Sequence, residues 1–359
     1  MLTTRTFTLK CMGTADDHER TLTALTASGV IAPTSPLAST ANPLWWNGRT
    51  PTPPRQLLHK QLVRELYDAT PALAHDQQAI LLAGPPGAGK STALGNVLTP
   101  EEGARYLHLD ADHFKTRLLA HAQEDGSLEA HYLAHPEVRA ARDRGEQFFP
   151  LELAALVHEE SSYLTQHVRA QAIASGANLL IDGVMSDENR TRALMDTLNA
   201  HGYTARIIDV EVPQEASLER TRGRWRAGYE QALAGDENAE PRWVPAAVVH
   251  GVYDEAGQSK PRRISETVAH ESQHVTEFHR FEITSEQWKA GAHSPEVVMH
   301  LRRPAGLTTL MDAALADTRD RTRATTQARP TLRLPTSTAT PTTPHRPQQT
   351  PHREPGLER

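Results

Sequence analysis

Residues 81–92 are LLAGPPGAGKST, and this stretch decides the fold. Four positions match the pattern G-x-x-x-x-G-K-[ST]: Gly84, Gly89, Lys90 and Ser91. An apolar run precedes the glycines and a helical pattern follows them, which is the strand–loop–helix setting of a phosphate-binding loop (P-loop). In such a loop, backbone N–H groups and the lysine contact phosphates, and the serine hydroxyl binds Mg²⁺. The sequence therefore predicts that ATP and Mg²⁺ are held by Gly84, Pro85, Pro86, Gly87, Ala88, Gly89, Lys90, Ser91 and Thr92.

Short apolar runs alternate with helical patterns between residues 56 and 303. Helices of ten or more residues separate most of the expected strands, and a long one is expected at 151–175. Buried strands joined by helices predict an α/β fold with a mostly parallel sheet and helices on both faces, which here means a P-loop kinase fold. The strands are expected at 79–84, 105–110, 177–182 and 205–212.

Three segments flank this 56–303 unit. Residues 1–55 show no regular period and end in a proline-rich stretch, so we expect an N-terminal extension to which the sequence assigns no role. A terminal helix is expected at 304–320. Residues 321–359 are rich in Thr and Pro and contain few apolar residues, so burial cannot offset the entropy of ordering them, and the sequence predicts a disordered tail.

Composition narrows the range of partners. The 359 residues carry a formal net charge of −6, so no global positive field attracts nucleic acid, and no nucleic-acid partner is expected. No apolar run approaches the roughly 20 residues that cross a membrane, and the N-terminus lacks the apolar segment of a signal peptide. With Cys11 as its single cysteine, the chain fits a reducing compartment. We therefore expect a cytoplasmic protein with no membrane contact.

Carboxylates follow two of the expected strands. The strand expected at 105–110 ends in Asp110 and Asp112, and Asp182 ends the strand at 177–182. Because ligands bind at the carboxyl edge of parallel sheets, these groups are expected beside the P-loop. One of the first two would assist Mg²⁺, as would Asp182, while the other accepts a proton from an acceptor hydroxyl. The alternatives are a helix cap for the first two and a solvated turn for Asp182.

Several motifs together resemble the zeta toxin family of P-loop kinases over residues 56 to 250. They are GPPGAGKST, LDADHF, a helix containing HEESS, LLIDG, an arginine-bearing helix and PRWVP. The resemblance implies an enzyme that uses ATP and Mg²⁺ to phosphorylate a sugar hydroxyl of a UDP-activated amino sugar, mainly UDP-N-acetylglucosamine. It also implies an antitoxin protein as a partner. Matched motif by motif, it assigns the phosphate lysine, the Mg²⁺ hydroxyl and the catalytic base to Lys90, Ser91 and Asp112.

The same resemblance assigns two phosphate-clamping arginines. They fall on Arg224 and Arg242, although Arg222 and Arg226 lie close enough for the first assignment to shift by two. A planar cation neutralises the charge that develops during phosphoryl transfer, so arginines suit this role independently of the family. Residues two apart on a helix point in different directions, so these arginines cannot all face one site.

The acceptor half departs from the family pattern. The sugar-contacting glutamate of the family falls on Gln166, with Glu159 and Glu160 about two turns earlier, and Val184 stands where the family often has Thr. The expected substrate contacts are accordingly Asp112, Glu160, Gln166 and Asp182. Other acceptors therefore stay open: an antibiotic, a nucleotide-type metabolite or, less favoured because no basic stripe is visible, a nucleic-acid end.

A zinc metallopeptidase is a remote alternative. His270, Glu271 and His274 form H-E-x-x-H, which on a helix holds zinc between two imidazoles with the glutamate as base. Only three positions of this pattern are fixed, and Arg280 stands where one peptidase class has a third histidine. The sequence then alternates like a strand, so we expect the helix to stop before His274.

Overall fold

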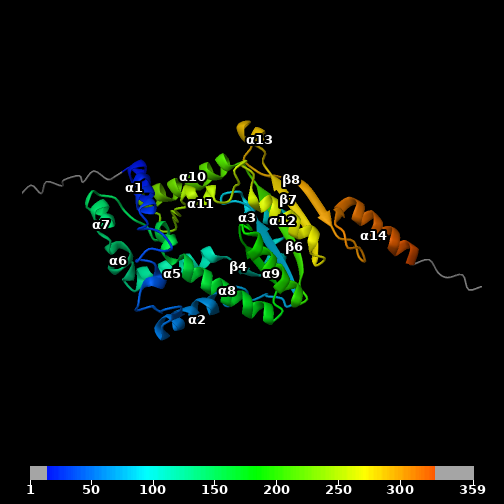
Figure 1. Ribbon diagram of the computed structural model, residues 1–359, viewed down its shortest axis with the longest axis horizontal. Helices are drawn as coiled ribbons and strands as arrows, with labels where there is room; N and C mark the ends of the chain where they lie inside the picture. The colour runs from blue at the N-terminus through cyan, green and yellow to red at the C-terminus, as the bar shows by residue number, and fades with distance from the viewer. Residues whose placement is uncertain (1–13, 328–359) are drawn as a thin grey trace, which may run out of the picture.

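A seven-stranded sheet forms the centre of the computed structural model, which describes residues 14–327 (Figure 1). The strand order is β4-β5-β3-β6-β7-β8-β9. The first five strands are parallel, β8 is antiparallel to β7, and β9 is antiparallel to β8. This confirms the predicted α/β class and mostly parallel sheet. The strands are β3 (Gln78–Ala83), β4 (Leu107–Leu109), β5 (Leu179–Asp182), β6 (Thr204–Glu211), β7 (Val275–Glu282), β8 (Glu296–Arg302) and β9 (Met311–Asp312), and β1 (Trp46–Asn47) pairs with β2 (Thr50–Pro51) in a separate hairpin.

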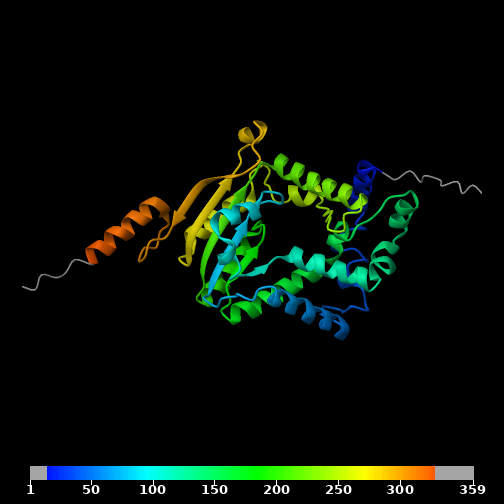
Figure 2. The ribbon, with the colours of Figure 1, turned by 180° about the vertical axis from the view of Figure 1, so that it is seen from behind.

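Helices cover both faces of the sheet (Figures 1 and 2). The longer ones are α1 (Ala15–Ala27), α2 (Pro53–Asp68), α3 (Lys90–Val97), α5 (Ala111–Glu124), α7 (Pro136–Asp143), α8 (His158–Ala174), α9 (Glu188–Ala200), α10 (Gln214–Leu233), α12 (Lys260–Glu271) and α14 (Ala313–Gln327). Single-turn helices are α4 (Pro100–Gly103), α6 (Ser127–Ala130), α11 (Ala246–His250) and α13 (Ser285–Lys289). None of the helices in this part of the chain is long and apolar enough to cross a membrane.

The central strand β3 shows why an uninterrupted apolar run becomes a strand here. Ala79 and Leu81 face the larger core, to which α5, α8, α9 and α12 contribute. Ile80 and Leu82 face the smaller core, formed with α3 and the start of α10. Side chains alternate along a strand, so a strand covered on both faces needs apolar residues at every position. This burial fixes the carboxyl end of β3, from which the P-loop emerges.

The expectation of an irregular segment at 1–55 is wrong for residues 15–27, which form α1. The helix begins at a capping box in which Thr14 and Asp17 bond each other's backbone, and Leu22 and Leu25 are buried in the larger core. Its buried face also carries His18, which weakens the apolar periodicity in the sequence. The N-terminal segment thus packs with the core that the sheet and its helices share.

Two helix boundaries also differ from expectation. The long helix expected at 151–175 is a 3₁₀ segment, Pro150–Val157, followed by α8. The terminal helix expected at 304–320 begins only at Ala313 and continues to Gln327, so residues 321–327 are helical rather than part of a disordered tail. Residues 1–13 and 328–359 lie outside the described residues.

Candidate active site

The P-loop joins β3 to α3 by a backbone path that requires glycine. Gly84 has φ 126°, and a Cβ added to it would lie 2.1 Å from the carbonyl oxygen of Val210 on β6. Gly89 has φ 95° and caps α3, so Lys90 is the first residue of the helix. The Lys90 ammonium donates to the Gly84 carbonyl at 3.3 Å, and Ser91 is exposed in the first turn. This geometry directs the α3 N-terminus and its N–H groups at the space above the loop, where an anion is favoured.

Helix α10 supports the outside of the loop. Ser217 donates to the Pro86 carbonyl at 2.6 Å, and Arg220 donates to the carbonyls of Gly87 and Ala88 at 3.3 and 3.4 Å. The sequence analysis missed these two residues, because their role depends on α10 lying across the loop. The loop is therefore held by hydrogen bonds as well as by glycine conformations.

Asp110 and Asp112 both lie at the N-terminus of α5, which corrects their expected positions along a strand. Asp110 is the N-cap, and its Oδ1 accepts from the backbone N–H of Asp112 at 2.8 Å. Asp112 pairs with Lys115 at 2.9 Å and with Arg242. Burial would raise the pKa of Asp112, but these two cations outweigh it and hold the pKa below its usual value. Asp112 is therefore a carboxylate at neutral pH.

Asp182 completes a group of acidic side chains near Lys90. It ends β5, next to β3, and its Oδ1 lies 3.8 Å from the Lys90 ammonium. Burial raises the pKa of Asp182; Lys90 opposes this rise, and the charges of Asp110 and Asp112 add to it. A divalent cation would relieve the mutual repulsion of these carboxylates. Ser91, Asp110 and Asp182 carry the hydroxyl and carboxylate oxygens that Mg²⁺ prefers as ligands.

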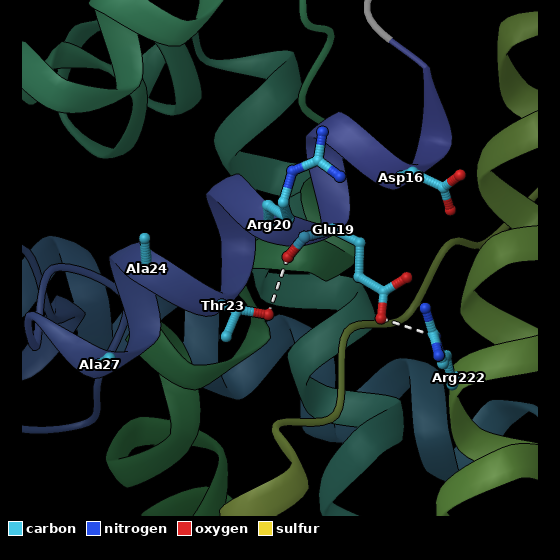
Figure 3. A pocket seen from close by; sticks show the side chains of 7 residues that line it. All are labelled: Asp16, Glu19, Arg20, Thr23, Ala24, Ala27 and Arg222. Carbon is cyan, nitrogen blue, oxygen red and sulfur yellow. Dashed lines mark hydrogen bonds and ion pairs between the residues drawn. The ribbon is translucent and has the colours of Figure 1, made fainter.

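The structure separates the arginines of α10 by their partners. Arg222 pairs with Glu19 of α1 at 2.6 Å, beside a surface pocket of about 430 Å³ between the two helices (Figure 3). Arg226 pairs with Asp16 of α1 at 2.5 Å. Both side chains thus hold α1 against α10. Arg224, between them in sequence, makes no hydrogen bond or ion pair within residues 14–327.

Arg242 contacts Asp112, and Arg224 lies near enough to both for their charges to act on it. Partial withdrawal from water lowers the pKa of Arg224; neighbouring Arg242 lowers it further, and Asp112 raises it. Arg242 pairs with Asp112 directly, and its second terminal nitrogen donates to the Thr116 hydroxyl at 3.4 Å. The structure therefore pairs Arg242 with Asp112 and places Arg224 within reach of their charges; the roles predicted for the three residues stay predictions. The sequence analysis missed the contact of Lys115 with Asp112, three residues earlier on the same helix. It had expected Asp112 to lie at the end of a strand.

Two expected substrate contacts lie elsewhere. Glu160 on α8 is fully buried; its oxygens accept from Arg55 at 2.6 and 2.8 Å and from His59 at 2.6 Å. Two side chains of α2 therefore bind this carboxylate. Gln166 is exposed on α8, and its side chain makes no hydrogen bond in the part of the chain that the structure describes. Of the other two expected contacts, Asp182 lies 3.8 Å from Lys90 of the P-loop, and the charge of Asp112 acts on the pKa of Asp182.

The H-E-x-x-H residues do not form a metallopeptidase site. Helix α12 ends at Glu271, and His274 lies in the following turn before β7. The two histidines therefore do not share a helix face, which confirms the expected helix end. Glu271 is exposed and pairs with Arg192 of α9, so it is not placed to act as a base on a zinc-bound water.

Comparison with known proteins agrees with this arrangement. The family model described as "Zeta toxin" matches residues 65–284, which is more than half of the chain. The chain belongs to the zeta toxin family. The match begins within α2 and ends just after β7, so its range includes the P-loop, Asp110, Asp112, Asp182, Arg224 and Arg242.

Solved structures resemble the chain at low sequence identity, and one of them has a TM-score above 0.5. The native crystal structure of the AvrRxo1-ORF1:-ORF2 complex is 17% identical with a TM-score of 0.51, covering 76% of this chain and 75% of that chain. The same complex with ATP is 17% identical with a TM-score of 0.49, covering 75% and 73%. A structure from the PezAT toxin-antitoxin system of Streptococcus pneumoniae is 15% identical with a TM-score of 0.39, covering 67% and 79%. No curated protein matches the chain in sequence.

Proposed function

We propose that this chain is an ATP- and Mg²⁺-dependent kinase that transfers the γ-phosphoryl group to a hydroxyl of a UDP-activated amino sugar, with UDP-N-acetylglucosamine as the acceptor. The observation that supports the proposal is the ion pair of a charged Asp112 with Arg242, with Arg224 near enough for the charges of both to act on it. A carboxylate next to two guanidinium groups supplies a base and a phosphate clamp in one place.

The residues divide the reaction among themselves. Lys90 and the loop N–H groups bind the nucleotide phosphates, and Ser91, Asp110 and Asp182 would hold Mg²⁺, which neutralises phosphate charge. As the acceptor oxygen bonds to the γ-phosphorus and the bond to the ADP oxygen breaks, the hydroxyl proton passes to Asp112. Arg224 and Arg242 stabilise the charge on the transferred group.

Two parts of the proposal rest on family membership. The UDP-sugar acceptor has no dedicated contact among the expected residues, since Glu160 is occupied by Arg55 and Gln166 lies on the exposed surface of α8. An antibiotic, a nucleotide-type metabolite or a nucleic-acid end is the alternative acceptor. An antitoxin partner follows from the family, and the chain would act as the toxin of that pair.

Mass spectrometry after incubation with ATP, Mg²⁺ and UDP-N-acetylglucosamine tests the acceptor. The proposal predicts a product heavier by one phosphoryl group. If a metabolite extract yields a different phosphorylated compound while the UDP-sugar stays unchanged, the kinase survives and the acceptor is wrong. If ATP is bound but no compound gains phosphate, the chain is an ATP-dependent switch rather than a kinase.

A matched pair of variants on α10 tests the clamp. Arg224→Ala should lower turnover by about 10²–10³-fold, the usual effect of losing one electrostatic stabiliser, with ATP binding retained. Arg222→Ala removes the same type of side chain two residues away. Because that side chain contacts α1, its loss should affect turnover much less. Equal losses in both variants would contradict the assignment of Arg224.

A further inference from the structure

A second group of ligand-type side chains lies on β7 and β8, on residues that the proposed kinase does not use. Glu277 and His279 of β7 and His300 of β8 each place a ligand atom within 4.8 Å of the other two. His279 and His300 are direct partners in the antiparallel register, and their rings stack with centroids 4.0 Å apart. Residues opposite each other, or two apart on one strand, share a face of a sheet. Strand pairing therefore determines this arrangement.

Hydrogen bonding within the group is incomplete. Nε2 of His300 lies 2.7 Å from Oε1 of Glu277 and bonds to it. Nε2 of His279 lies 3.1 Å from the same oxygen, yet it is buried and makes no hydrogen bond. A buried polar atom without a partner is costly, so its persistence calls for an explanation.

The charge of Glu277 is met by imidazoles alone. Among residues 14–327, its ion-pair partners are His279 and His300, with no lysine or arginine. Arg206, aligned with Glu277 on β6, donates to the Tyr106 hydroxyl at 3.2 Å instead. The partly buried carboxylate and the two imidazoles therefore bring three metal-ligand atoms together.

We propose that Glu277, His279 and His300 bind a divalent transition-metal ion of the Zn²⁺ type. Imidazole nitrogen and carboxylate oxygen are ordinary zinc ligands at about 2.0–2.2 Å, which places ligand atoms about 3.4 Å apart at a tetrahedral centre. The present separations of 2.7 and 3.1 Å are shorter than this by about 0.7 and 0.3 Å, so the ligand atoms would move apart to admit an ion. Because the His300 side chain is 38% exposed, water can take the fourth position.

The ion would link β7 to the strand that leads away from the P-loop. Strand β8 begins just after Pro295, whose ring lies 3.9 Å from the position of a Cβ on Gly89. In the same segment, the His293 carbonyl accepts from Arg220 at 2.7 Å. Metal binding would therefore hold β8 in place, next to the segment 293–295 that contacts the P-loop and Arg220. It would also give the buried Nε2 of His279 a partner.

Zinc titration of the metal-free full-length chain, by calorimetry and without nucleotide, tests the proposal. We expect about one Zn²⁺ per chain, a raised unfolding temperature and, with Co²⁺, the intense visible absorption of a four-coordinate site. His300→Ala and Glu277→Gln should each weaken binding by at least the roughly 10–100-fold that loss of a ligand's supporting partner costs. The two changes lie on different strands, and both residues are partly exposed, so folding of the apo variants is checked by circular dichroism and one variant remains informative if the other misfolds.

The matched controls are His270→Ala and His274→Ala, which remove exposed histidines close by in sequence and should leave zinc affinity unchanged. Absence of stoichiometric zinc binding by the unsubstituted chain would overturn the proposal. So would equal affinity in a folded His300→Ala or Glu277→Gln variant. Loss of zinc in the controls alone would transfer the site to the H-E-x-x-H residues. Each readout is independent of phosphoryl transfer, so failure of the proposed kinase would not affect the result.

Discussion

Replacing Glu160 by glutamine separates a structural role for this residue from a substrate-binding one. Glu160 is fully buried, and Arg55, at 5% exposure, forms two hydrogen bonds to it. Glutamine keeps the shape but removes the charge, which leaves the buried guanidinium without a counter-ion. Breaking one side of a buried ion pair costs about 3–5 kcal/mol. At about 2–4 °C per kcal/mol for a domain of 150–250 residues, we expect the unfolding temperature to fall by roughly 6–20 °C.

Thermal unfolding at pH 7, followed by circular dichroism, measures this fall. The control is Glu159→Gln, one position earlier and exposed, which should change stability by less than about 0.5 kcal/mol. The reasoning would be refuted if Glu160→Gln left the unfolding temperature unchanged but raised the KM for the acceptor. That result would restore Glu160 as a substrate contact.

Acid unfolding gives an independent measure. Burial alone would raise the pKa of Glu160, but hydrogen bonds from Arg55 and His59 outweigh it and lower the pKa to about 2, from 4.5 in an unfolded chain. A lowered carboxyl pKa contributes stability that is present above pH 4.5 and is lost as the pH falls towards 2. Glu160→Gln should remove this share of the acid sensitivity.

Three further predictions concern other residues. Gly84→Ala should abolish ATP binding in a titration, because its Cβ would lie 2.1 Å from the Val210 carbonyl oxygen, where real contacts stay beyond 3.0 Å; unimpaired binding would mean that the loop moves freely. Asp112→Asn should lower turnover by about 10²–10⁴-fold while ATP still binds, whereas Lys90→Ala should impair both, and wild-type turnover of Asp112→Asn would exclude it as the base. Burial, and then a neighbouring carboxylate, raise the pKa of Glu211 to about 9 from 4.5, so its folded form loses stability as pH rises through this range. Glu211→Gln should therefore stabilise the chain against heat more at pH 8 than at pH 5, and a pH-independent effect would contradict the raised pKa.

Local patterns carried most of the fold prediction. The apolar positions of β3 signal a strand covered on both faces, and four fixed positions of the P-loop require the strand and helix that flank it. These features depend on residues close together in the sequence. They could therefore be predicted before any tertiary contact was known.

What the sequence left open depends on distant partners. Glu160 is removed from the site by Arg55, which lies 105 positions away. The choice among the arginines of α10 depends on Glu19 of α1, which occupies Arg222. Helix α1 itself was missed because its buried face includes His18, whose partners include Glu146, 128 positions later. The hydrophobic periodicity of a single segment cannot indicate contacts with residues so far away in the sequence.

The two ion pairs between α1 and α10 hold in place the helix that carries Arg224. Arg222 and Arg226 are four residues apart and share one side of α10, whereas Arg224 lies between them and points elsewhere. These ion pairs can therefore prevent α10 from rotating about its axis while leaving the side that carries Arg224 uncovered. A chain shortened to begin at residue 28 would keep the sheet, the P-loop and Arg55 but lose α1, and with it Asp16 and Glu19, which form these ion pairs. We expect such a chain to bind nucleotide and to transfer phosphate slowly, so the smallest fully competent piece extends back to Thr14, where α1 is capped.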